Sequence, residues 1–287
     1  MNNYLNTLNP RQREAVETVK GPVLIMAGAG SGKTKALTCR LAYMLEQGIY
    51  PNEILAITFT NKAAQEMRER VHNLVGPAAD RIWMYTFHSF GARFLRREIA
   101  SYPPYTDRFT IYDSDDSKTL VKNCLKELNL DDKQLIDPKK YRELAGSNFF
   151  NQKAADVYEL YDKHMKENNA LDFDDLLYIT TKLLSIETIR KRWQDRFHYI
   201  LIDEYQDTNH AQYLMAKYIA GNTQNICAVG DADQSIYSWR GADLRNIMDF
   251  QKDYPKAKLI KLEQNYRSTQ TILDAANAVI QNLSLIH

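Results

Sequence analysis

The sequence has few cysteines, and their positions exclude the most common roles of this residue. Its 287 residues include three cysteines, Cys39, Cys124 and Cys227. They lie far apart and none belongs to a C-x-x-C pair, so neither a disulfide framework nor a zinc site is indicated. We expect reduced thiols that are mostly buried.

Long apolar runs are also missing. No run approaches the ~18 residues that a membrane-spanning helix needs, and the polar start MNNYLNTLNP lacks the basic and apolar regions of a secretory signal peptide. We therefore expect a cytoplasmic protein with no membrane partner.

The chain has no excess of charge of either sign. Lys and Arg total 37 against 36 Asp and Glu, which gives a formal net charge of +1. A nucleic-acid partner would therefore need a local basic groove rather than a uniformly basic surface. The hydrophobic share of 44% and the charged share of 25% are typical of a globular protein with one large domain or two ordinary ones.

What the sequence does contain is a regular alternation of strand and helix patterns. Helical patterns such as 61–75 and 268–283 follow short apolar runs that are typical of strands buried on both faces. These runs are 22–27, 54–59, 82–87, 199–204, 225–231 and 258–263. The alternation predicts an α/β fold, with a parallel sheet covered by helices on both faces.

The alternation stops between about 105 and 172. This stretch contains amphipathic helical patterns with Lys and Glu on the outer faces, and it contains no strand candidate. We predict an all-α domain, residues 107–170, inserted into an α/β domain formed by residues 1–106 and 171–287.

A phosphate-binding loop follows the first predicted strand. The segment AGAGSGKT (27–34) supplies Gly28, Gly30, Gly32, Lys33 and Thr34 and then begins a helix. Glycines let backbone N–H groups surround phosphate oxygens, the lysine reaches the β and γ phosphates, and the hydroxyl binds Mg²⁺. Ala27 stands where the usual pattern begins with Gly, and its small side chain still permits a tight turn. The alternative is a flexible Gly/Ser linker that happens to precede a lysine.

Two acidic residues end the fourth predicted strand, in YILIDEYQDTN. Asp203 and Glu204 stand at the end of an apolar strand, where open α/β sheets bind their ligands. We expect Asp203 to hold Mg²⁺ through its water shell and Glu204 to orient and deprotonate an attacking water. Two adjacent acids alone would usually be a solvated turn, but here they accompany a phosphate-binding loop.

With these motifs the chain resembles the N-terminal half of a UvrD/Rep/PcrA-type superfamily 1 DNA helicase. The resemblance extends from LNPRQREAV (8–16) to LEQNYRST (262–269). It implies a RecA-like P-loop NTPase domain that a helical domain interrupts. It also implies an ATP-dependent 3′–5′ helicase or translocase with ATP and Mg²⁺ as cofactors, and with single-stranded DNA and single-strand/double-strand junctions as partners.

The resemblance assigns nucleotide roles to matching residues. Gln12 would read the adenine edge, Tyr266 would stack on the adenine, and Arg267 would approach the γ-phosphate as an arginine finger. The residues expected at the nucleotide are Gln12, Ala29, Gly30, Ser31, Gly32, Lys33, Thr34, Lys35, Arg40, Asp203, Tyr266 and Arg267, and those with catalytic roles are Lys33, Glu204, Gln234 and Arg267.

The resemblance also implies a DNA-binding edge, with Phe59, Thr60, Asn61, Thr86, His88, Tyr237, Trp239 and Arg240 as its residues. In GDADQSIYSWRGAD (230–243), Gln234 would sense the γ-phosphate and Trp239 would stack on a base, which is worth ~1–3 kcal/mol per base. One short loop would then couple nucleotide state to grip on DNA. The alternatives are that Phe59 and Trp239 are core aromatics. The acids of LDFDDLL (171–177) could equally cap a helix, and we give them no catalytic role.

After AVIQNLSLIH no motif of a second RecA-like domain follows. We therefore expect the chain alone to bind ATP–Mg²⁺ weakly, to hydrolyse it slowly and not to unwind a duplex, and we expect a monomer. One alternative is a nucleotide-dependent single-strand-binding module without motor activity. The other is a small-substrate phosphotransferase, in which Gln234, Trp239 and Arg267 would have no reason to occur together. The sequence specifies neither protein partners nor a pathway.

Overall fold

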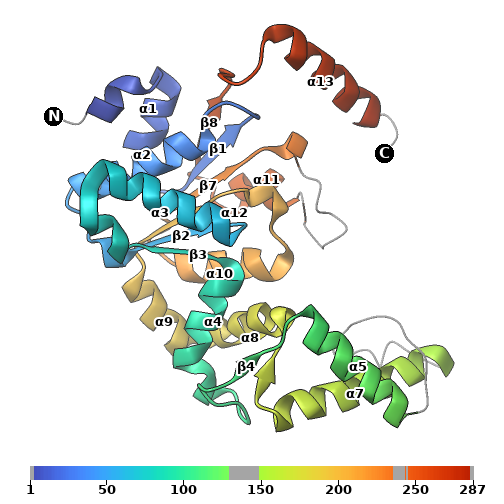
Figure 1. Cartoon of the computed structure of the whole chain (residues 1–287). Helices are drawn as coiled ribbons and strands as arrows, with labels where there is room; N and C mark the ends of the chain where they lie inside the picture. The colour runs from blue at the N-terminus through green and yellow to red at the C-terminus, as the bar shows by residue number, and fades with distance from the viewer. Residues whose placement is uncertain (1–2, 129–148, 235–242, 244, 285–287) are drawn as a thin grey trace. The chain divides into compact units, whose positions relative to one another are not determined.

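The computed structural model describes residues 3–128, 149–234, 243 and 245–284, so Tyr237, Trp239 and Arg240 lie outside the described residues (Figure 1). The chain forms two compact units: the sheet unit, residues 1–89 and 184–287, and the helical unit, residues 90–183. The boundaries of these units differ from those of the three segments expected from the sequence, 1–106, 107–170 and 171–287. The expected domain boundaries stay a prediction.

A six-stranded parallel sheet forms the centre of the sheet unit, in the order β3-β2-β6-β7-β1-β8 (Figure 1). The strands are β1 (Val23–Ala27), β2 (Ile54–Thr58), β3 (Trp83–Thr86), β6 (Tyr199–Ile202), β7 (Ile226–Gly230) and β8 (Lys258–Leu262). All six strands predicted from the sequence are confirmed, and so is the parallel α/β fold class.

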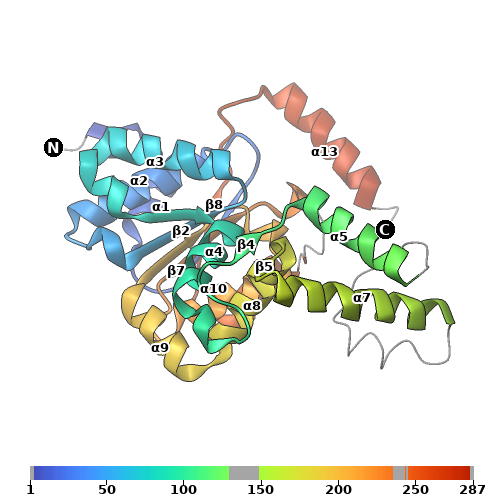
Figure 2. The ribbon, with the colours of Figure 1, turned by 60° about the horizontal axis from the view of Figure 1, so that its bottom comes forward.

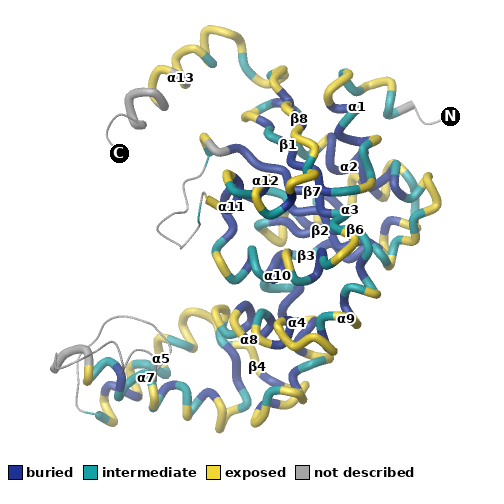
Figure 3. The backbone as a smooth tube through the Cα atoms, turned by 180° about the vertical axis from the view of Figure 1, so that it is seen from behind, coloured by how far each residue is buried: buried dark blue, intermediate teal, exposed yellow. Residues whose placement is uncertain are grey.

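Burial differs among the strands of the sheet. Every residue of β2 and β7 is buried, as expected for strands with a neighbour on each side and helices on both faces (Figure 3). The expectation of burial on both faces is wrong for β8, where only Ile260 and Leu262 are buried and Lys258 and Lys261 are exposed. Ile260 and Leu262 point to the core from one face of β8, whereas Leu259 and Lys261 on its other face are exposed. The exposed lysines of this edge strand discourage pairing with another chain.

Helices cover both faces of this sheet (Figure 2). On one face α2 (Lys33–Glu46) and α3 (Asn61–Val75) pack Leu37, Leu41 and Met67 into the core with strand residues. On the other face are α9 (Glu187–Arg196) and α10 (His210–Ala220), and the ring of Trp83 contacts Trp193 edge to face. The remaining elements of this unit are η1 (Asn3–Thr7), α1 (Pro10–Glu17), η2 (Pro51–Glu53), η3 (Gly76–Arg81), η5 (Tyr205–Asp207), η6 (Ala232–Gln234), α11 (Arg245–Met248), α12 (Phe250–Asp253) and α13 (Gln270–Ser284).

The helical unit has a small core of its own, in which Cys124, Tyr161, Met165 and Ala170 are buried. Its elements are α4 (Phe87–Glu98), which begins in the sheet unit, η4 (Ile99–Ser101), β4 (Thr110–Ile111), α5 (Ser114–Glu127), α7 (Phe149–Glu167), β5 (Ala170–Leu171) and α8 (Phe173–Ser185), which ends in the sheet unit. The parallel pair β4–β5 was not anticipated, because two residues are too few for a recognisable strand pattern.

The three cysteines are free and buried, as expected, and burial raises the pKa of each thiol. Within the described residues, none of the helices combines the length and the apolar character that crossing a bilayer requires.

Candidate functional site

The strands of the sheet unit run parallel, so the segments that follow them meet at one edge of the sheet. This carboxyl edge is where open α/β sheets bind ligands. The phosphate-binding loop follows β1, the acidic pair follows β6, and the segment that carries Gln234 follows β7. Three parts of the sequence therefore supply one site.

The phosphate-binding loop turns tightly between β1 and α2. The backbone N–H of Ser31 donates to the carbonyl of Gly28 at 3.2 Å, and the Ser31 hydroxyl donates to the same oxygen at 2.7 Å. Gly32 precedes α2 with a left-handed φ of 86°, which favours glycine. Lys33 is the first residue of α2, so the partial positive charge of the helix N-terminus adds to its ammonium group.

Gln12 is buried against this loop. Its Nε2 donates to the carbonyl of Ser31 at 2.9 Å, and its Oε1 accepts from the backbone N–H of Asn9 at 3.2 Å in a capping box that begins α1. A Cβ on Gly32 would lie 2.6 Å from the same Nε2. The Gln12 amide thus supports the loop, and its contact with adenine stays a prediction.

The segment after β8 also contacts the loop. The Asn265 side chain donates to the carbonyl of Ala29 and accepts from the backbone N–H groups of Arg267 and Ser268, and the N–H of Tyr266 donates to the carbonyl of Gly30 at 2.9 Å. This places Tyr266 and Arg267 beside the loop, where both side chains are exposed.

Glu204 has a strained backbone at the end of β6. Its φ is 49° and its ψ is 47°, a left-handed conformation that is costly for a residue with a side chain and that is often found at functional sites. The Nζ of Lys33 lies 3.5 Å from Glu204 Oε2. The carboxylate of Glu204 thus faces the lysine of the phosphate-binding loop.

Two further carboxyl groups accompany Glu204. Burial and, to a smaller extent, the charge of Glu204 raise the pKa of Asp203 to about 6 and the pKa of Asp207 to about 6. Negative charge is therefore concentrated at this point, where a bound cation would stabilise it.

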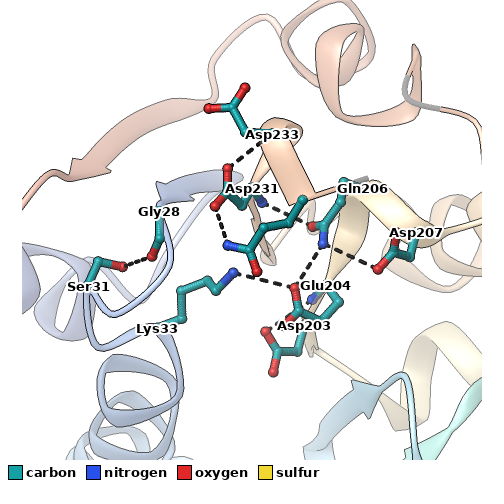
Figure 4. A network of polar contacts seen from close by, with 10 residues as sticks. Gly28, Ser31, Lys33, Asp203, Glu204, Gln206, Asp207, Asp231 and Asp233 are labelled. Atoms are coloured by element: carbon teal, nitrogen blue, oxygen red, sulfur yellow. Dashed lines mark hydrogen bonds and ion pairs between the residues drawn. The ribbon is translucent and has the colours of Figure 1, made fainter. Parts of the chain in front are cut away.

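A buried amide connects these acids to the neighbouring strand (Figure 4). The Nε2 of Gln206 donates to Glu204 Oε2 at 2.9 Å and to Asp207 Oδ2 at 3.3 Å, while its Oε1 accepts from the backbone N–H of Asp231 at 3.0 Å. The Asp231 carboxylate in turn accepts from the amide of Gln234. The acidic pair, Asp203 and Glu204, and the predicted sensor Gln234 thus belong to one hydrogen-bond network.

Asp203, Glu204, Gln206, Asp207 and Gln234 help to line a cavity of about 340 Å³. Its lining residues are Thr34, Phe59, Thr60, Ala63, Glu66, Met67, Asp203, Glu204, Gln206, Asp207 and Gln234. The cavity combines the hydroxyl at the start of α2, the carboxylates after β6 and the segment after β2. Phe59 is half-buried on its wall rather than fully enclosed in the core.

The sequence of residues 8–255 matches the family model described as UvrD/REP helicase N-terminal domain. This chain belongs to the UvrD/REP helicase family.

Two relatives cover nearly the whole chain. The ATP-dependent DNA helicase PcrA of Bacillus subtilis is 50% identical over 301 residues, which cover 99% of this chain and 40% of that protein. PcrA of Staphylococcus aureus is 49% identical over 302 residues, which cover 99% of this chain and 41% of that protein. The chain thus spans about two fifths of the length of the curated relatives it matches. The crystal structure of Pif1 helicase from Candida albicans aligns with a TM-score of 0.45 and 13% identity, over 95% of this chain and 44% of that chain.

The donor set of this UvrD/REP-type site fits a magnesium ion that arrives with a nucleotide. Within the described ranges, no group of three or more His, Cys, Asp or Glu residues could hold a metal ion by itself. Thr34 and Asp203, the two expected ligands, line the same cavity. Mg²⁺ keeps several waters and is usually bound by one or two carboxylates together with phosphate oxygens, so a hydroxyl and one carboxylate would fit this role.

Several predicted DNA-binding residues also lie at the carboxyl edge. Thr60 caps α3 by accepting from the backbone N–H of Ala63 at 3.1 Å. The Thr86 hydroxyl donates to Ser89 Oγ at 3.0 Å, and the Ser89 hydroxyl donates to Asn61 Oδ1 at 3.0 Å. The structure therefore brings the segments after β2 and β3 together, and half-buried His88 belongs to the second of them.

Two predicted nucleotide ligands have other partners. The Nζ of Lys35 donates to the carbonyl of Thr7 at 2.7 Å. The guanidinium of Arg40 is buried, and it donates to the carbonyls of Ala15 and Val19. Their contact with nucleotide stays a prediction.

Four residues of the site were not predicted from the sequence: Gln206, Asp207, Asp231 and Asn265. Gln206, Asp207 and Asn265 stand in polar segments after predicted strands, and Asp231 is the last residue of a predicted strand. Their position next to Glu204, Gln234 and Arg267 was the available signal.

Proposed function

We propose that this chain binds ATP with Mg²⁺ at the phosphate-binding loop and single-stranded DNA along the adjacent strand ends. In the whole protein it would couple ATP hydrolysis to 3′–5′ movement on DNA and to unwinding. The observation that carries this proposal is the single cavity that joins Thr34, Asp203, Glu204 and Gln234 to Phe59 and Thr60. The relatives, named ATP-dependent DNA helicases, support the same function.

Each nucleotide-binding residue has a physical role in this proposal. Lys33 and the N-terminus of α2 balance the charge of the β and γ phosphates. Thr34 and Asp203 would hold Mg²⁺, and the ion would supply positive charge against the charge that develops on the phosphates. Glu204 accepts a proton from the attacking water, Gln234 orients that water, and Arg267 contacts the γ-phosphate, while Tyr266 stacks on the adenine.

The DNA strand would cross the edge next to the cavity. Phe59 offers a ring face to a base, and Thr60 and Asn61 offer hydrogen-bond donors to phosphates. The buried Thr86 hydroxyl donates to Ser89 and would support this edge from below. Tyr237, Trp239 and Arg240 would continue this path beyond the described residues. Phe59 and Gln234 line the same cavity, so a change at the γ-phosphate would alter the contact between Phe59 and the DNA. Single-strand/double-strand junctions are the substrates that an unwinding activity requires.

The test is the fluorescence anisotropy of a labelled oligo-dT titrated with the protein at low salt, with and without a non-hydrolysable ATP analogue. Phe59→Ala should weaken binding about 5- to 150-fold, the loss of one stacked base. Tyr50→Ala is the matched control, because Tyr50 is an exposed aromatic at the opposite end of β2. Nucleotide binding without any binding of oligo-dT would contradict the proposal and favour a small-substrate phosphotransferase.

A further inference from the structure

Gln206 is a polar residue in an unusual place. Its side chain is 1% exposed, and it makes three hydrogen bonds, to Glu204, to Asp207 and to the backbone of Asp231. A buried amide is costly unless its donors and acceptor are satisfied. Here both ends of the amide are used, and each end contacts a different strand end.

The two strand ends that Gln206 joins carry the chemistry of the site. Glu204 follows β6, Asp231 follows β7, and these strands are hydrogen-bonded neighbours. The backbone of Gly230 approaches the Gln206 side chain so closely that a Cβ there would lie 2.6 Å from its Oε1. The amide therefore fills the space between the strand ends and holds a fixed orientation.

The contacts of Gln206 also distinguish the two carboxylate oxygens of Glu204. Both Lys33 Nζ, at 3.5 Å, and Gln206 Nε2, at 2.9 Å, contact Oε2. Oε1 takes part in neither of these two contacts, and we expect it to be the oxygen that accepts a proton. A carboxylate is useful as a base only when its free lone pairs point to the water, because a misplacement of 1 Å can cost about 100-fold in rate.

We infer that Gln206 is a positioning residue that orients Glu204 for proton transfer and ties it, through Asp231, to the sensor Gln234. This inference rests on the proposed function, in which Glu204 is the base. The amide is required because it donates to Glu204 and Asp207 and accepts from Asp231 at the same time. A carboxylate in its place would repel both acids, and a thioether would donate to neither of them.

The effect of Gln206 should depend on Glu204. A residue that acts through Glu204 must lose its effect when Glu204 no longer acts as a base. A residue that merely stabilises the fold would lower the rate equally in both backgrounds.

The experiment measures single-turnover ATP hydrolysis by the full-length protein with saturating oligo-dT, together with the Kd for the nucleotide. Gln206→Met should lower the hydrolysis rate about 10- to 100-fold and change the nucleotide Kd less than twofold. In the Glu204→Gln background the same substitution should change the remaining rate less than twofold. Gln212→Met is the matched control, since Gln212 is also a buried glutamine but serves the capping box of α10.

Three outcomes separate the inference from the proposed function. If Glu204→Gln leaves hydrolysis unchanged, the assignment of the base is wrong, and the inference falls with it. If Glu204→Gln stops hydrolysis but Gln206→Met stays within twofold of wild type, only the inference is overturned. Equal rate losses in both backgrounds overturn it as well. Should Gln206→Met not fold, Gln206→Asn, which keeps a neutral amide on a side chain too short to reach both strand ends, is tested against the same limits.

Discussion

The ammonium nitrogen of Lys33 lies 3.5 Å from Glu204 Oε2, although 171 positions of sequence separate the two residues. The side chain of Lys33 is 11% exposed and that of Glu204 is 34% exposed, so this ion pair is partly shielded from water. Each charge thus has the other as a partner. In the proposed mechanism a polyphosphate would replace Glu204 at Lys33, and the carboxylate would become free to act on water.

Replacement of this lysine tests the phosphate site. Lys33→Ala should weaken ATP and ADP binding at least about 10- to 100-fold, because a charged hydrogen-bond donor to the phosphates is lost. Titration calorimetry measures the effect, with Lys20→Ala, an exposed lysine, as the control. Unchanged affinity would show that the loop does not bind the phosphates through Lys33.

Replacement of the acid tests the chemical step. Glu204→Gln should keep ATP and DNA binding within about threefold and lower hydrolysis on the order of 10²- to 10⁴-fold, as expected for the loss of a general base. Glu66→Gln is the control, because Glu66 is another carboxylate on the wall of the same cavity. Normal turnover in Glu204→Gln would mean that another group accepts the proton.

The Asn265 side chain is expected to preorganise the phosphate-binding loop. Its Nδ2 donates to the carbonyl of Ala29. A trans peptide is planar, so a fixed Ala29 carbonyl also fixes the Gly30 N–H, which points in the opposite direction. Asn265→Ala should weaken ADP binding about 3- to 10-fold and adenosine binding not at all. Asn225→Ala, which removes a similar side-chain contact to Gly21, is the control. Equal losses for ADP and adenosine would contradict this role.

Asp175 in the helical unit makes stability dependent on pH. Burial, and next the charge of Asp172, raise the pKa of its carboxyl to about 7 from 3.8. The folded state therefore holds the proton more tightly than the unfolded state, and this group lowers stability progressively as the pH rises from about 4 to 7. Asp175→Asn should be more stable than wild type by ~1–3 kcal/mol at pH 8.5, with a difference that shrinks towards pH 5.

Urea unfolding at the two pH values measures this effect. Asp174→Asn is the control, because Asp174 is the exposed neighbour of Asp175 on α8. A stability gain of the same size at both pH values would show that the proton on Asp175 is not its cause.

The sequence predicted the parts of the molecule that depend on local patterns. All six strands of the sheet were recognisable, because central parallel strands are continuous apolar runs. Helix α3 was predicted over 61–75, where it begins with the cap residue Thr60 and ends before Gly76. Asp203 and Glu204 could be located because they end one of these strands.

Contacts between distant segments could not be predicted in this way. The bond between Gln206 and Asp231 and the bond between Asn265 and Ala29 join segments whose pairing depends on the strand order β6-β7-β1-β8. The hydrophobic periodicity of the sequence does not reveal this strand order. For the same reason the sequence did not show that the Gln12 amide is engaged by the loop, since this contact exists only after α1 has packed beside α2.

The order of the strands also has a consequence for biosynthesis. The strand that carries the phosphate-binding loop, β1, is made early, but both of its neighbours are made late: Val23 pairs with Cys227 on one side and with Lys258 on the other. Contacts between such distant residues form slowly, and synthesis proceeds from the N-terminus. We therefore expect the growing chain to carry β1 as an apolar strand with two open edges, which a chaperone would have to shield. ATP capture would begin only once β8 has left the ribosome.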